Sequence, residues 1–377
     1  MQRRVHQPRD NWQEIVESQG LSFYLTDDRP YWNESACYVF TADEIDALET
    51  ATYALDKMCL QAVEYVIKNN LFEQFQIPAP FIPLIKSSWE TDEQTIYGRF
   101  DFAFDGSTPK LLEYNADTPT GLIEAAVIQW FWLKDVFSGD EFDQFNSIHE
   151  RLIEAWKSVK TRPGDSLYFC AMEDVPEDFL TANYLRDTAM QAGHDTQFIG
   201  IENIGWNERD HVFTDLDEKP INTIFKLYPW EWLAREEFGK HLAANTARWL
   251  EPPWKMLLSN KAILPLLHQL FPNSPYILPA AFEPIGNSYI QKPILGREGA
   301  NMRLIIDEKI IQETDGPYDG DCVYQEYSAL PDFDGNFPVI GSWMVNGYAC
   351  GIGIREESAR ITTNQSRFVP HYFETRK

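Results

Sequence analysis

The sequence is short of basic residues and has no paired cysteines. Only 32 Lys and Arg residues stand against 58 Asp and Glu residues, a formal net charge of −26. Such a surface repels phosphate backbones, which argues against general nucleic-acid binding. It would attract Mg²⁺ or polyamines, although solubility alone is the simpler explanation. No disulfide framework or zinc site is expected, because the cysteines are odd in number and form no CxxC pair; they are Cys37, Cys59, Cys170, Cys322 and Cys350.

Long apolar runs are also missing. The longest stretch, residues 121–133, is interrupted by Glu124 and Gln129 and is shorter than the roughly 20 residues that cross a bilayer. The first residues, MQRRVHQPRDNW, lack the apolar core of a signal peptide. We therefore expect a soluble, cytoplasmic protein with no membrane partner, of undetermined oligomeric state. Its 377 residues, 44% of them hydrophobic, favour two or three lobes around a cleft.

Several catalytic signatures are absent as well. The sequence contains no HExxH, GxSxG, Walker A or GxGxxG motif, and its seven histidines are scattered. Metalloprotease, serine-hydrolase, P-loop and dinucleotide-binding interpretations therefore have little support.

What is present begins with a long amphipathic helix. Thr41 and Glu44 form a capping box before it, and the helix is predicted to end near Asn69 and Asn70. Its apolar face is expected to contain Ile45, Leu48, Thr52, Leu55, Cys59, Ala62 and Val66. The proline-rich segment 76–83 is predicted to be a connector.

Helices and strands then alternate, which predicts a layered α/β region. The predicted helices cover 119–137, 144–159, 178–192 and 230–250, and the predicted strands cover 167–172, 196–201 and 221–227. Beyond Pro253, short strands and tight turns predict an α+β nucleotide-binding module, with a helix capped by Ser259 and a hairpin at Asn346-Gly347. We predict three parts: a helical segment and connector (1–90), an α/β domain with a polar hairpin and substrate cleft (91–250), and nucleotide-binding lobes (251–377).

The polar hairpin, residues 95–104 and 110–115, is the most informative stretch. Side chains alternate along a strand, so Phe100, Phe102 and Phe104 share one face, and Leu112 is expected to point the same way as Tyr114. If residues 105–109 form the loop, Phe104 lies opposite Lys110. Counting back then gives the facing pairs Asp101–Glu113 and Arg99–Asn115.

Like charges directly opposite each other destabilise a sheet, so Asp101 and Glu113 need a counter-charge. Carboxylate and amide oxygens suit Mg²⁺, with Asn115 as a third ligand, and Arg99 beside the metal could neutralise a transferring phosphoryl group. If this is the reason for the pair, neutralising one carboxylate in the absence of metal would raise the melting temperature. A surface hairpin with one polar face explains the spacing about equally well.

A second group of candidates surrounds a glycine loop. Lys292 ends a predicted strand, 288–294, just before Gly296-Arg297-Glu298-Gly299. Exposed amides at glycines can bind phosphate oxygens, while Lys292 adds a point charge and Arg297 a planar fork. Lys261 is expected in the first turn of a helix, where a cation opposes the dipole, and Arg355 ends a late strand. A plain turn and a solvent-exposed lysine are the alternatives.

Six motifs, in order, resemble the synthetase domain of the glutathionylspermidine synthetase family, an acid–amine ligase of the ATP-grasp type. They are YGRFDF, LLEYNADTPT, LSNKAILPLL, KPILGREGAN, GIGIRE and SRFVPHY, and the resemblance runs from about Asn11 to Tyr372. It implies a mixed α+β and α/β protein, in which a permuted ATP-grasp fold follows an α/β domain. Nothing resembles the cysteine-dependent amidase domain of bifunctional members, so hydrolysis of the conjugate is not expected.

The resemblance also implies roles for individual residues. The implied Mg²⁺ ligands are Asp101, Glu113 and Asn115. The implied ATP contacts are Arg99, Phe100, Asp101, Lys261, Lys292, Gly299, Gln325, Glu326, Tyr327, Ser328, Arg360, Ile361 and Thr362. The implied catalytic arginines, near the reacting carboxylate and phosphates, are Arg99, Arg297 and Arg355. Thr118 and Thr120 stand where glutathione-using members carry small serines, and Glu173 and Asp174 could accept the ammonium group of the amine.

The predicted function is an ATP- and Mg²⁺-dependent ligase that forms an amide through an acyl phosphate. A glutathione or peptide carboxylate and a polyamine-like amine are the expected substrates. The alternatives are a nucleotide-binding regulatory protein without turnover, which the intact set of charged residues disfavours, and a small-molecule kinase.

Overall fold

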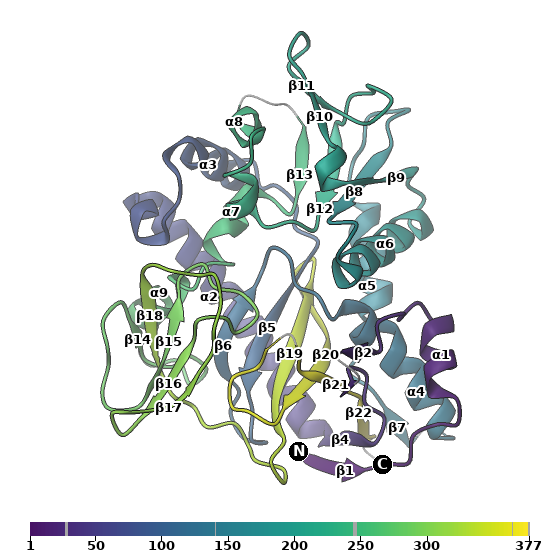
Figure 1. The fold of residues 1–377 in the computed structure, drawn as a ribbon, viewed down its shortest axis with the longest axis vertical. Coiled ribbons are helices and arrows are strands. Elements are labelled where there is room, and N and C mark those ends of the chain that lie inside the picture. The colour runs from purple at the N-terminus through teal and green to yellow at the C-terminus, as the bar shows by residue number, and fades with distance from the viewer. Residues whose placement is uncertain (27–28, 140, 244–246, 364, 376–377) are drawn as a thin grey trace.

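The polar hairpin lies within a five-stranded antiparallel sheet, here the central sheet, of the computed structural model (Figure 1), which describes residues 1–26, 29–139, 141–243, 247–363 and 365–375. The strand order is β21-β20-β19-β5-β6. Their bounds are β5 Tyr97–Ala103, β6 Lys110–Asn115, β19 Phe337–Val345, β20 Tyr348–Glu357 and β21 Arg367–Val369. The hairpin predicted at Asn346-Gly347 joins β19 to β20, and β19 pairs with β5, so both predicted hairpins share one sheet.

Helix α2 (Ala42–Asn69) packs on the central sheet. Both halves of its capping box are formed, and Asn70 ends it in a left-handed conformation with φ 55°. The predicted apolar face is confirmed, because all of its residues are buried. They share one hydrophobic core with Phe100, Phe102 and Phe104, and Thr52 Oγ1 lies 2.7 Å from Ser342 Oγ of β19.

A four-stranded parallel sheet, ordered β13-β12-β8-β9, forms the next part of the molecule. Its strands are β8 Leu167–Ala171, β9 Thr196–Gly200, β12 Thr223–Lys226 and β13 Arg248–Leu250, with helices α5 Ile148–Lys157 and α6 Pro176–Gln191 beside it. The helix predicted over 230–250 is wrong. Two short helices, α7 Trp230–Leu233 and α8 Gly239–Leu242, precede β13 instead. The chain turns sharply between them, where a Cβ at Gly239 would stand 2.3 Å from the Leu233 carbonyl oxygen.

A second five-stranded sheet, ordered β14-β18-β15-β16-β17, faces the polar hairpin. Its strands are β14 Ala280–Ala281, β15 Tyr289–Pro293, β16 Arg303–Ile306, β17 Lys309–Glu313 and β18 Cys322–Glu326. Helix α9 (Ile263–Leu270) packs on β14 and β18. The predicted cap at Ser259 is wrong, because its hydroxyl accepts the Ala116 N–H at 3.1 Å instead. Lys261 therefore precedes α9 by two residues and does not lie in its first turn.

The two ends of the chain meet in a fourth sheet, ordered β1-β4-β22-β7. Its strands are β1 Gln2–Val5, β4 Ala36–Thr41, β7 Phe142–Asp143 and β22 His371–Glu374, and β4 runs parallel to β22. Figure 1 accordingly shows the N and C labels close together. Shared sheets thus cross the predicted boundaries at 90 and 250, and the division into three parts stays a prediction.

The remaining elements are short. They are α1 Trp12–Ser18, β2 Leu25–Thr26, β3 Arg29–Pro30, α3 Ile82–Glu90, α4 Gln129–Val136, β10 Gly205–Asn207, β11 Val212–Thr214, a π-helical turn Glu124–Ile128, and 3₁₀ turns at Phe72–Phe75, Ala79–Phe81, Ile201–Asn203 and Pro253–Leu257. The predicted connector thus contains a 3₁₀ turn and the start of α3. The helix predicted from Pro119 begins later and starts with the π turn.

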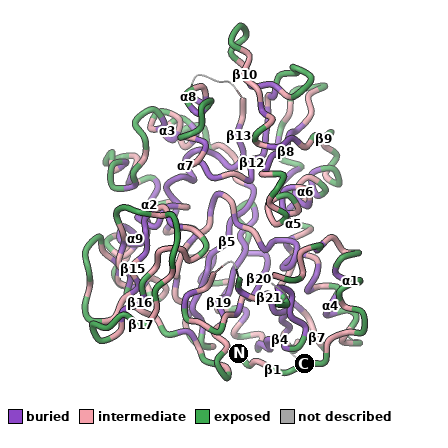
Figure 2. Tube along the Cα trace, viewed as in Figure 1, coloured by how far each residue is buried: buried purple, intermediate pink, exposed green. Residues whose placement is uncertain are grey.

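Burial follows these layers. Figure 2 shows the buried residues concentrated in the central sheet, in α2 and in the parallel sheet, with exposed residues along the outer loops. Within the described ranges, no helix combines the length and apolarity that a membrane crossing requires.

We expect Thr52→Val to lower the free energy of unfolding by about 1–3 kcal/mol, because the Ser342 hydroxyl would lose its buried partner. The double variant Thr52→Val/Ser342→Ala should cost less than the sum of the two single variants. Urea unfolding of the four proteins measures this coupling. Strictly additive costs would contradict it.

Candidate active site

The hairpin register brings the predicted site residues together. Asp101 pairs with Glu113 and Arg99 with Asn115, as predicted. The register then shifts between Asp101 and Phe102, so Lys110 lies opposite Ala103 and not opposite Phe104. A β-bulge at Leu112 accounts for this correction, because one extra residue on β6 restores the match at Glu113.

The bulge turns Leu112 away from the face that Tyr114 occupies. Tyr114 stacks on Phe100 in the main core, whereas Leu112 packs beside Val339 and lines the cleft. The expectation that Leu112 and Tyr114 point the same way is therefore wrong. At the bulge, the Leu111 and Leu112 carbonyls accept hydrogen bonds from Gln325 Nε2 and Lys292 Nζ, each at 2.8 Å.

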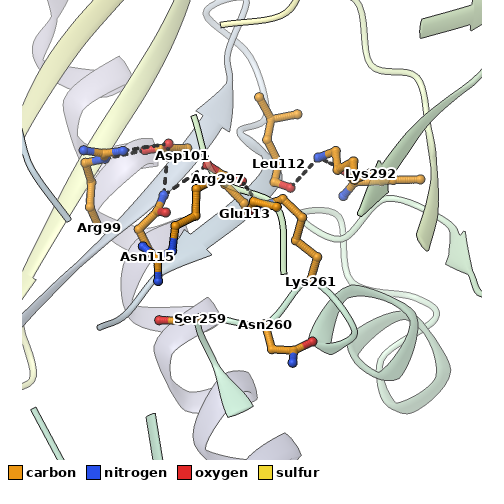
Figure 3. A network of polar contacts seen from close by, with 12 residues as sticks. Arg99, Asp101, Leu112, Glu113, Asn115, Ser259, Asn260, Lys261, Lys292 and Arg297 are labelled. Carbon is orange, nitrogen blue, oxygen red and sulfur yellow. Dashed lines mark hydrogen bonds and ion pairs between the residues drawn. The ribbon is translucent and has the colours of Figure 1, made fainter. Parts of the chain in front are cut away.

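Asp101 is the more buried of the two facing carboxylates, at 2% exposed. Arg99 Nε and Arg355 Nη2 lie 2.7 and 2.6 Å from its oxygens (Figure 3 draws the Arg99 pair). Asn115 Nδ2 donates to both carboxylates, at 3.2 Å from Asp101 and 3.2 Å from Glu113. The two arginines come from β5 and β20, so Asp101 links the two strands that flank β19.

Glu113 faces two lysines, Lys261 in the turn before α9 and Lys292 on β15. Lys261 Nζ lies 3.0 Å from Glu113 Oε2 and donates to the Gly296 carbonyl at 2.6 Å. Lys292 Nζ donates to Gln325 Oε1 and the Leu112 carbonyl, both at 2.8 Å. Burial by itself raises the pKa of Glu113, but the charges of Lys261 and Lys292 outweigh it, and the pKa lies below its ordinary value. Burial lowers the pKa of Lys292 to about 8.

These side chains line a cleft of about 390 Å³. Most of the predicted site residues meet there: Arg99, Asp101, Glu113, Asn115, Thr118, Thr120, Lys292, Arg297, Gly299, Tyr327, Ser328, Arg355, Arg360, Ile361 and Thr362. Lys261 lines a small recess beside the cleft, together with Glu113 and Arg297. Three of the implied ATP contacts do not line the cleft with their side chains. Phe100 is fully buried in the core, Gln325 is bonded behind Lys292, and Glu326 is exposed.

The glycine loop lies against the segment at 360–362. Gly299 has φ +69°, and a Cβ there would stand 2.2 Å from the Thr362 carbonyl oxygen. Both facts require glycine at this position. Arg297, two residues earlier, pairs with Glu231 of α7 at 2.8 Å and donates to Thr118 Oγ1 at 2.8 Å. The predicted fork is therefore directed at the Thr118 side of the cleft and not at Asp101.

Asp117 fixes the segment that carries Thr118 and was missed from the sequence. It is fully buried, accepts the Lys226 ammonium at 2.5 Å and accepts the Trp230 N–H at 3.0 Å. The ion pair therefore ties the end of β6 to β12 of the parallel sheet and to the start of α7. The signal that could have indicated Asp117 was its position within the NADTPT motif, directly before Thr118.

The acids beside the cleft differ from the predicted ones. Glu177 and Asp178, in the first turn of α6, line the cleft, whereas Glu173 and Asp174 line a separate cavity. Burial raises the pKa of Glu177, and burial together with the charges of Glu177 and Glu298 raises the pKa of Asp178 to about 7. Acids in the first turn of a helix normally interact favourably with the helix dipole, so their position in the sequence did not indicate a role in the site.

The donor set of the hairpin fits Mg²⁺. Asp101 and Glu113 offer carboxylate oxygens from facing positions, and Mg²⁺ takes one or two carboxylates plus substrate phosphates and water. Asn115 turns its Nδ2 toward both carboxylates, so its Oδ1 would become a ligand only after the amide turns over. Among the described residues, no group of three or more His, Cys, Asp and Glu side chains could hold a metal by itself. A metal at the hairpin would therefore need ligands from a bound substrate.

Glu124 is a buried carboxyl close to the cleft, on the π-helical turn. Its Oε1 accepts the Tyr31 hydroxyl at 2.7 Å, while Oε2 is buried and has no hydrogen-bond partner among the described residues. Burial, and next the charge of Glu177, raises the pKa of Glu124 to about 7. Glu124, Glu177 and Asp178 thus form a group of acids that ionise less readily than usual.

Comparison with known proteins places this geometry in a family. The sequence profile described as "Glutathionylspermidine synthase preATP-grasp" matches residues 3–374. A Haemophilus influenzae protein, whose name assigns it provisionally as an acid–amine ligase, is 42% identical over 371 residues, which cover 94% of each chain. The bifunctional glutathionylspermidine synthetase/amidase of Escherichia coli is 29% identical over 88% of this chain and 58% of its own length. Trypanothione synthetase of Crithidia fasciculata is 30% identical over 82% and 52%.

Among solved structures, a glutathione synthetase-like effector from Globodera pallida, in its apo form, superposes with a TM-score of 0.57. The match covers 96% of this chain and 97% of the effector at 11% identity, and it supports the predicted mixed α/β fold. The fold and the relatives together define an acid–amine ligase, an enzyme that forms amide bonds. The chain belongs to the glutathionylspermidine synthase family, as its six motifs predicted.

We expect Glu113→Gln to lower the melting temperature of the ligand-free protein, opposite to the change that the hairpin alone suggests. The variant leaves Lys261 and Lys292 without their shared counter-charge, a loss of about 1–3 kcal/mol at neutral pH. The pKa of Glu113 is lowered by folding, so the difference should shrink as the pH falls below the ordinary value of 4.5. Calorimetry across this range tests both points, and a higher melting temperature for the variant would contradict the pairing.

We expect Glu124→Gln to change the pH dependence of stability. Folding raises the pKa of Glu124 from 4.5 to about 7, so its contribution is fully present below pH 4.5 and is lost as the pH rises through 7. The variant removes this loss, which amounts to about 3 kcal/mol. Its melting temperature, compared with the parent, should therefore rise between pH 5 and pH 8. If the melting temperatures of the variant and the parent instead differ by a constant amount from pH 5 to pH 8, the pKa of Glu124 is not raised by folding.

Proposed function

We propose that the protein is an ATP- and Mg²⁺-dependent ligase that activates a carboxylate as an acyl phosphate and transfers it to an amine. One observation carries the proposal. Asp101, Glu113 and Asn115 offer oxygen ligands between two arginines on one side and two lysines on the other. Four cations around a two-carboxylate site suit a polyanion with its metal, and they suit no neutral ligand equally well.

The lysine side of the cleft suits the nucleotide. Lys261 and Lys292 are both buried, and they stand beside a glycine loop that allows close backbone approach. Tyr327 and Ser328 follow β18 and would face the base, while Arg360, Ile361 and Thr362 would border the sugar and phosphates. When bound, Mg²⁺ would neutralise phosphate oxygens and leave the reacting phosphorus open to attack.

The arginine side suits the reacting carboxylate. In the first step, a carboxylate oxygen attacks the γ-phosphorus, the bond to the β-phosphate oxygen breaks, and ADP leaves. Arg99 and Arg355 would stabilise the negative charge that spreads over the transferring group. Arg297, with Thr118 and Thr120 beside it, would orient the carboxylate and whatever molecule carries it.

In the second step, the amine nitrogen attacks the acyl carbon, the carbon–oxygen bond breaks, and phosphate leaves. The nitrogen must arrive as the free base and loses one proton to water after attack. Glu177 and Asp178 are the acids nearest to this reaction, and their raised pKa values favour exchange of a proton near neutral pH. A glutathione or peptide carboxylate and a polyamine-like amine remain our preferred substrates, on the basis of the family.

The proposal is tested by ATP turnover across a matrix of acids and amines, with mass detection of new amides. We expect ADP and phosphate, not AMP and pyrophosphate, in amounts equal to the amide. Glu113→Gln serves as the inactive variant. Release of a phosphorylated acid without amide would indicate the kinase alternative. Nucleotide binding without any turnover, in the presence of every acid and amine, would indicate the regulatory alternative.

We expect Lys292→Ala and Arg355→Ala to impair different properties of the enzyme, the first its nucleotide affinity and the second its kcat. Lys292 would contact phosphates that are already present in the ground state, so its loss should weaken nucleotide binding at least about tenfold. Arg355 would act on charge that develops during transfer, so its loss should lower kcat by about a hundredfold or more with little change in nucleotide affinity. Calorimetry with a non-hydrolysable ATP analogue separates the two. Equal affinity in Lys292→Ala and the parent would contradict the assignment.

A further inference from the structure

Helix α7 holds the arginine of the glycine loop. Glu231 Oε1 accepts Arg297 Nε at 3.0 Å and Nη2 at 2.8 Å, so one carboxylate oxygen binds the whole side-on edge of the guanidinium. Glu231 lines a separate small pocket and not the cleft. Trp232, the next residue but one after Trp230, does line the cleft, and its ring centroid lies 5.8 Å from Arg297 Cζ. Two residues of one short helix thus fix where the guanidinium lies.

Bonds and backbone together close a ring through Arg297. Thr118 Oγ1 accepts Arg297 Nη1 at 2.8 Å, and Thr118 directly follows Asp117 in the chain. Asp117 accepts the Trp230 N–H at 3.0 Å, and Trp230 directly precedes Glu231. The ring therefore joins the end of β6, α7 and the glycine loop. It leaves the guanidinium fewer orientations than a single ion pair would, because two segments of backbone hold it at once.

Helix α7 is itself anchored in the protein core. Trp230 is 1% exposed, and its indole Nε1 donates to the Glu251 carbonyl at 3.0 Å. Lys226 pairs with Asp117 at 2.5 Å, and its ammonium lies 4.7 Å from the centroid of the Trp230 ring. Glu231 consequently extends from a fixed segment, and it can hold a loop residue in place.

The ring leaves a defined set of donors unused. A guanidinium has five N–H groups, and three of those of Arg297 are bonded to Glu231 and Thr118. One N–H on Nη1 and one on Nη2 remain, with no acceptor among the described residues. The Thr118 hydroxyl accepts from Arg297, so its own hydrogen is available, and it has no acceptor in the described part of the chain either. Both side chains line the cleft, so together they present three donors to it.

We propose that Glu231 is a positioning residue for the acid substrate. It holds the side-on edge of Arg297 so that the two remaining N–H groups, with the Thr118 hydroxyl, bind the substrate carboxylate, whose two oxygens suit paired donors. Glu231 touches no substrate and acts only through Arg297. This inference rests on the proposed ligase function, and it assigns the ring to the acid and not to the nucleotide, which Lys261 and Lys292 would hold.

The first test needs no ligand. Hydroxyphenylglyoxal modifies accessible guanidinium groups, and peptide mass spectrometry measures its rate of reaction with Arg297. We expect Glu231→Gln to raise this rate about fivefold or more, because a neutral amide holds the guanidinium less tightly. Glu313→Gln is the matched control, since it removes the partner of another arginine, Arg303, from a pair of 2.6 Å outside the cleft, and it should leave the rate at Arg297 unchanged. Equal rates in Glu231→Gln and the parent overturn the proposal.

The second test measures steady-state ligation. The acid probe is glutathione or, if another acid reacts faster in the matrix described above, that acid. We expect Glu231→Gln to raise the KM of the acid about tenfold or more, while the KM values of ATP and the amine change by less than about twofold. A raised KM for ATP instead would assign Arg297 to the nucleotide and overturn the proposal. A lowered KM for the acid would overturn it too, because Glu231 would then compete with the substrate for Arg297.

A double-mutant cycle separates positioning from a general structural role. If Glu231 acts only through Arg297, adding Glu231→Gln to Arg297→Ala should change kcat/KM for the acid by less than about twofold. A structural role for Glu231 would reduce kcat/KM by the same factor in both backgrounds, and that result overturns the proposal.

These outcomes are distinguishable from failure of the ligase proposal. If amides form but Glu231→Gln leaves the KM of the acid unchanged, the positioning role fails and the ligase stands. If no acid and amine pair forms an amide while Glu231→Gln still exposes Arg297 to the reagent, the ligase proposal fails and the hold of Glu231 on Arg297 stands.

Discussion

The close approach of Asp101 and Glu113 across β5 and β6 puts two negative charges where a sheet ordinarily avoids them. Their neutralisation involves four cations from separate parts of the chain: Arg99 on β5, Arg355 on β20, Lys261 before α9 and Lys292 on β15. The repulsion between the pair thus becomes an attraction between the central sheet and the neighbouring sheet. These ion pairs engage the carboxylate oxygens, so a nucleotide with its metal would have to exchange partners with them.

The bulge at Leu112 lies where the second five-stranded sheet meets the hairpin. It frees backbone carbonyls that Gln325 and Lys292 bind, so the second sheet is fastened to the first by side chain-to-backbone bonds and not by a continuous ladder. These bonds keep Lys292 beside Glu113. Bulges next to active sites commonly redirect side chains in this way, and here the redirected side chain is Leu112 itself.

The carboxyl groups in and beside the cleft differ in the direction in which their pKa values are shifted. Burial acts to raise the pKa of Glu113, but the charges of Lys261 and Lys292 hold that pKa below its ordinary value, whereas burial raises the pKa of Glu124, Glu177 and Asp178. The same residue type therefore serves two purposes within one cleft: charged oxygens for a cation, and carboxyls that exchange protons near neutral pH.

The sequence by itself determined the parts that depend on local periodicity and spacing. The capping box, the face of α2 and the pairs Asp101–Glu113 and Arg99–Asn115 follow from periods of 3.6 and 2 and from one turn, so neighbouring residues were sufficient. Six ordered motifs also indicated the family and most of the cleft. The prediction of one helix over 230–250 was wrong, because the chain turns tightly at Gly239 and residues 248–250 pair with β12 as strand β13. Only the tertiary structure decided that Glu177 and Asp178 line the cleft while Glu173 and Asp174 line a separate cavity. The direction in which the end of a strand or the first turn of a helix faces depends on the elements that pack against it, and these are distant in the sequence.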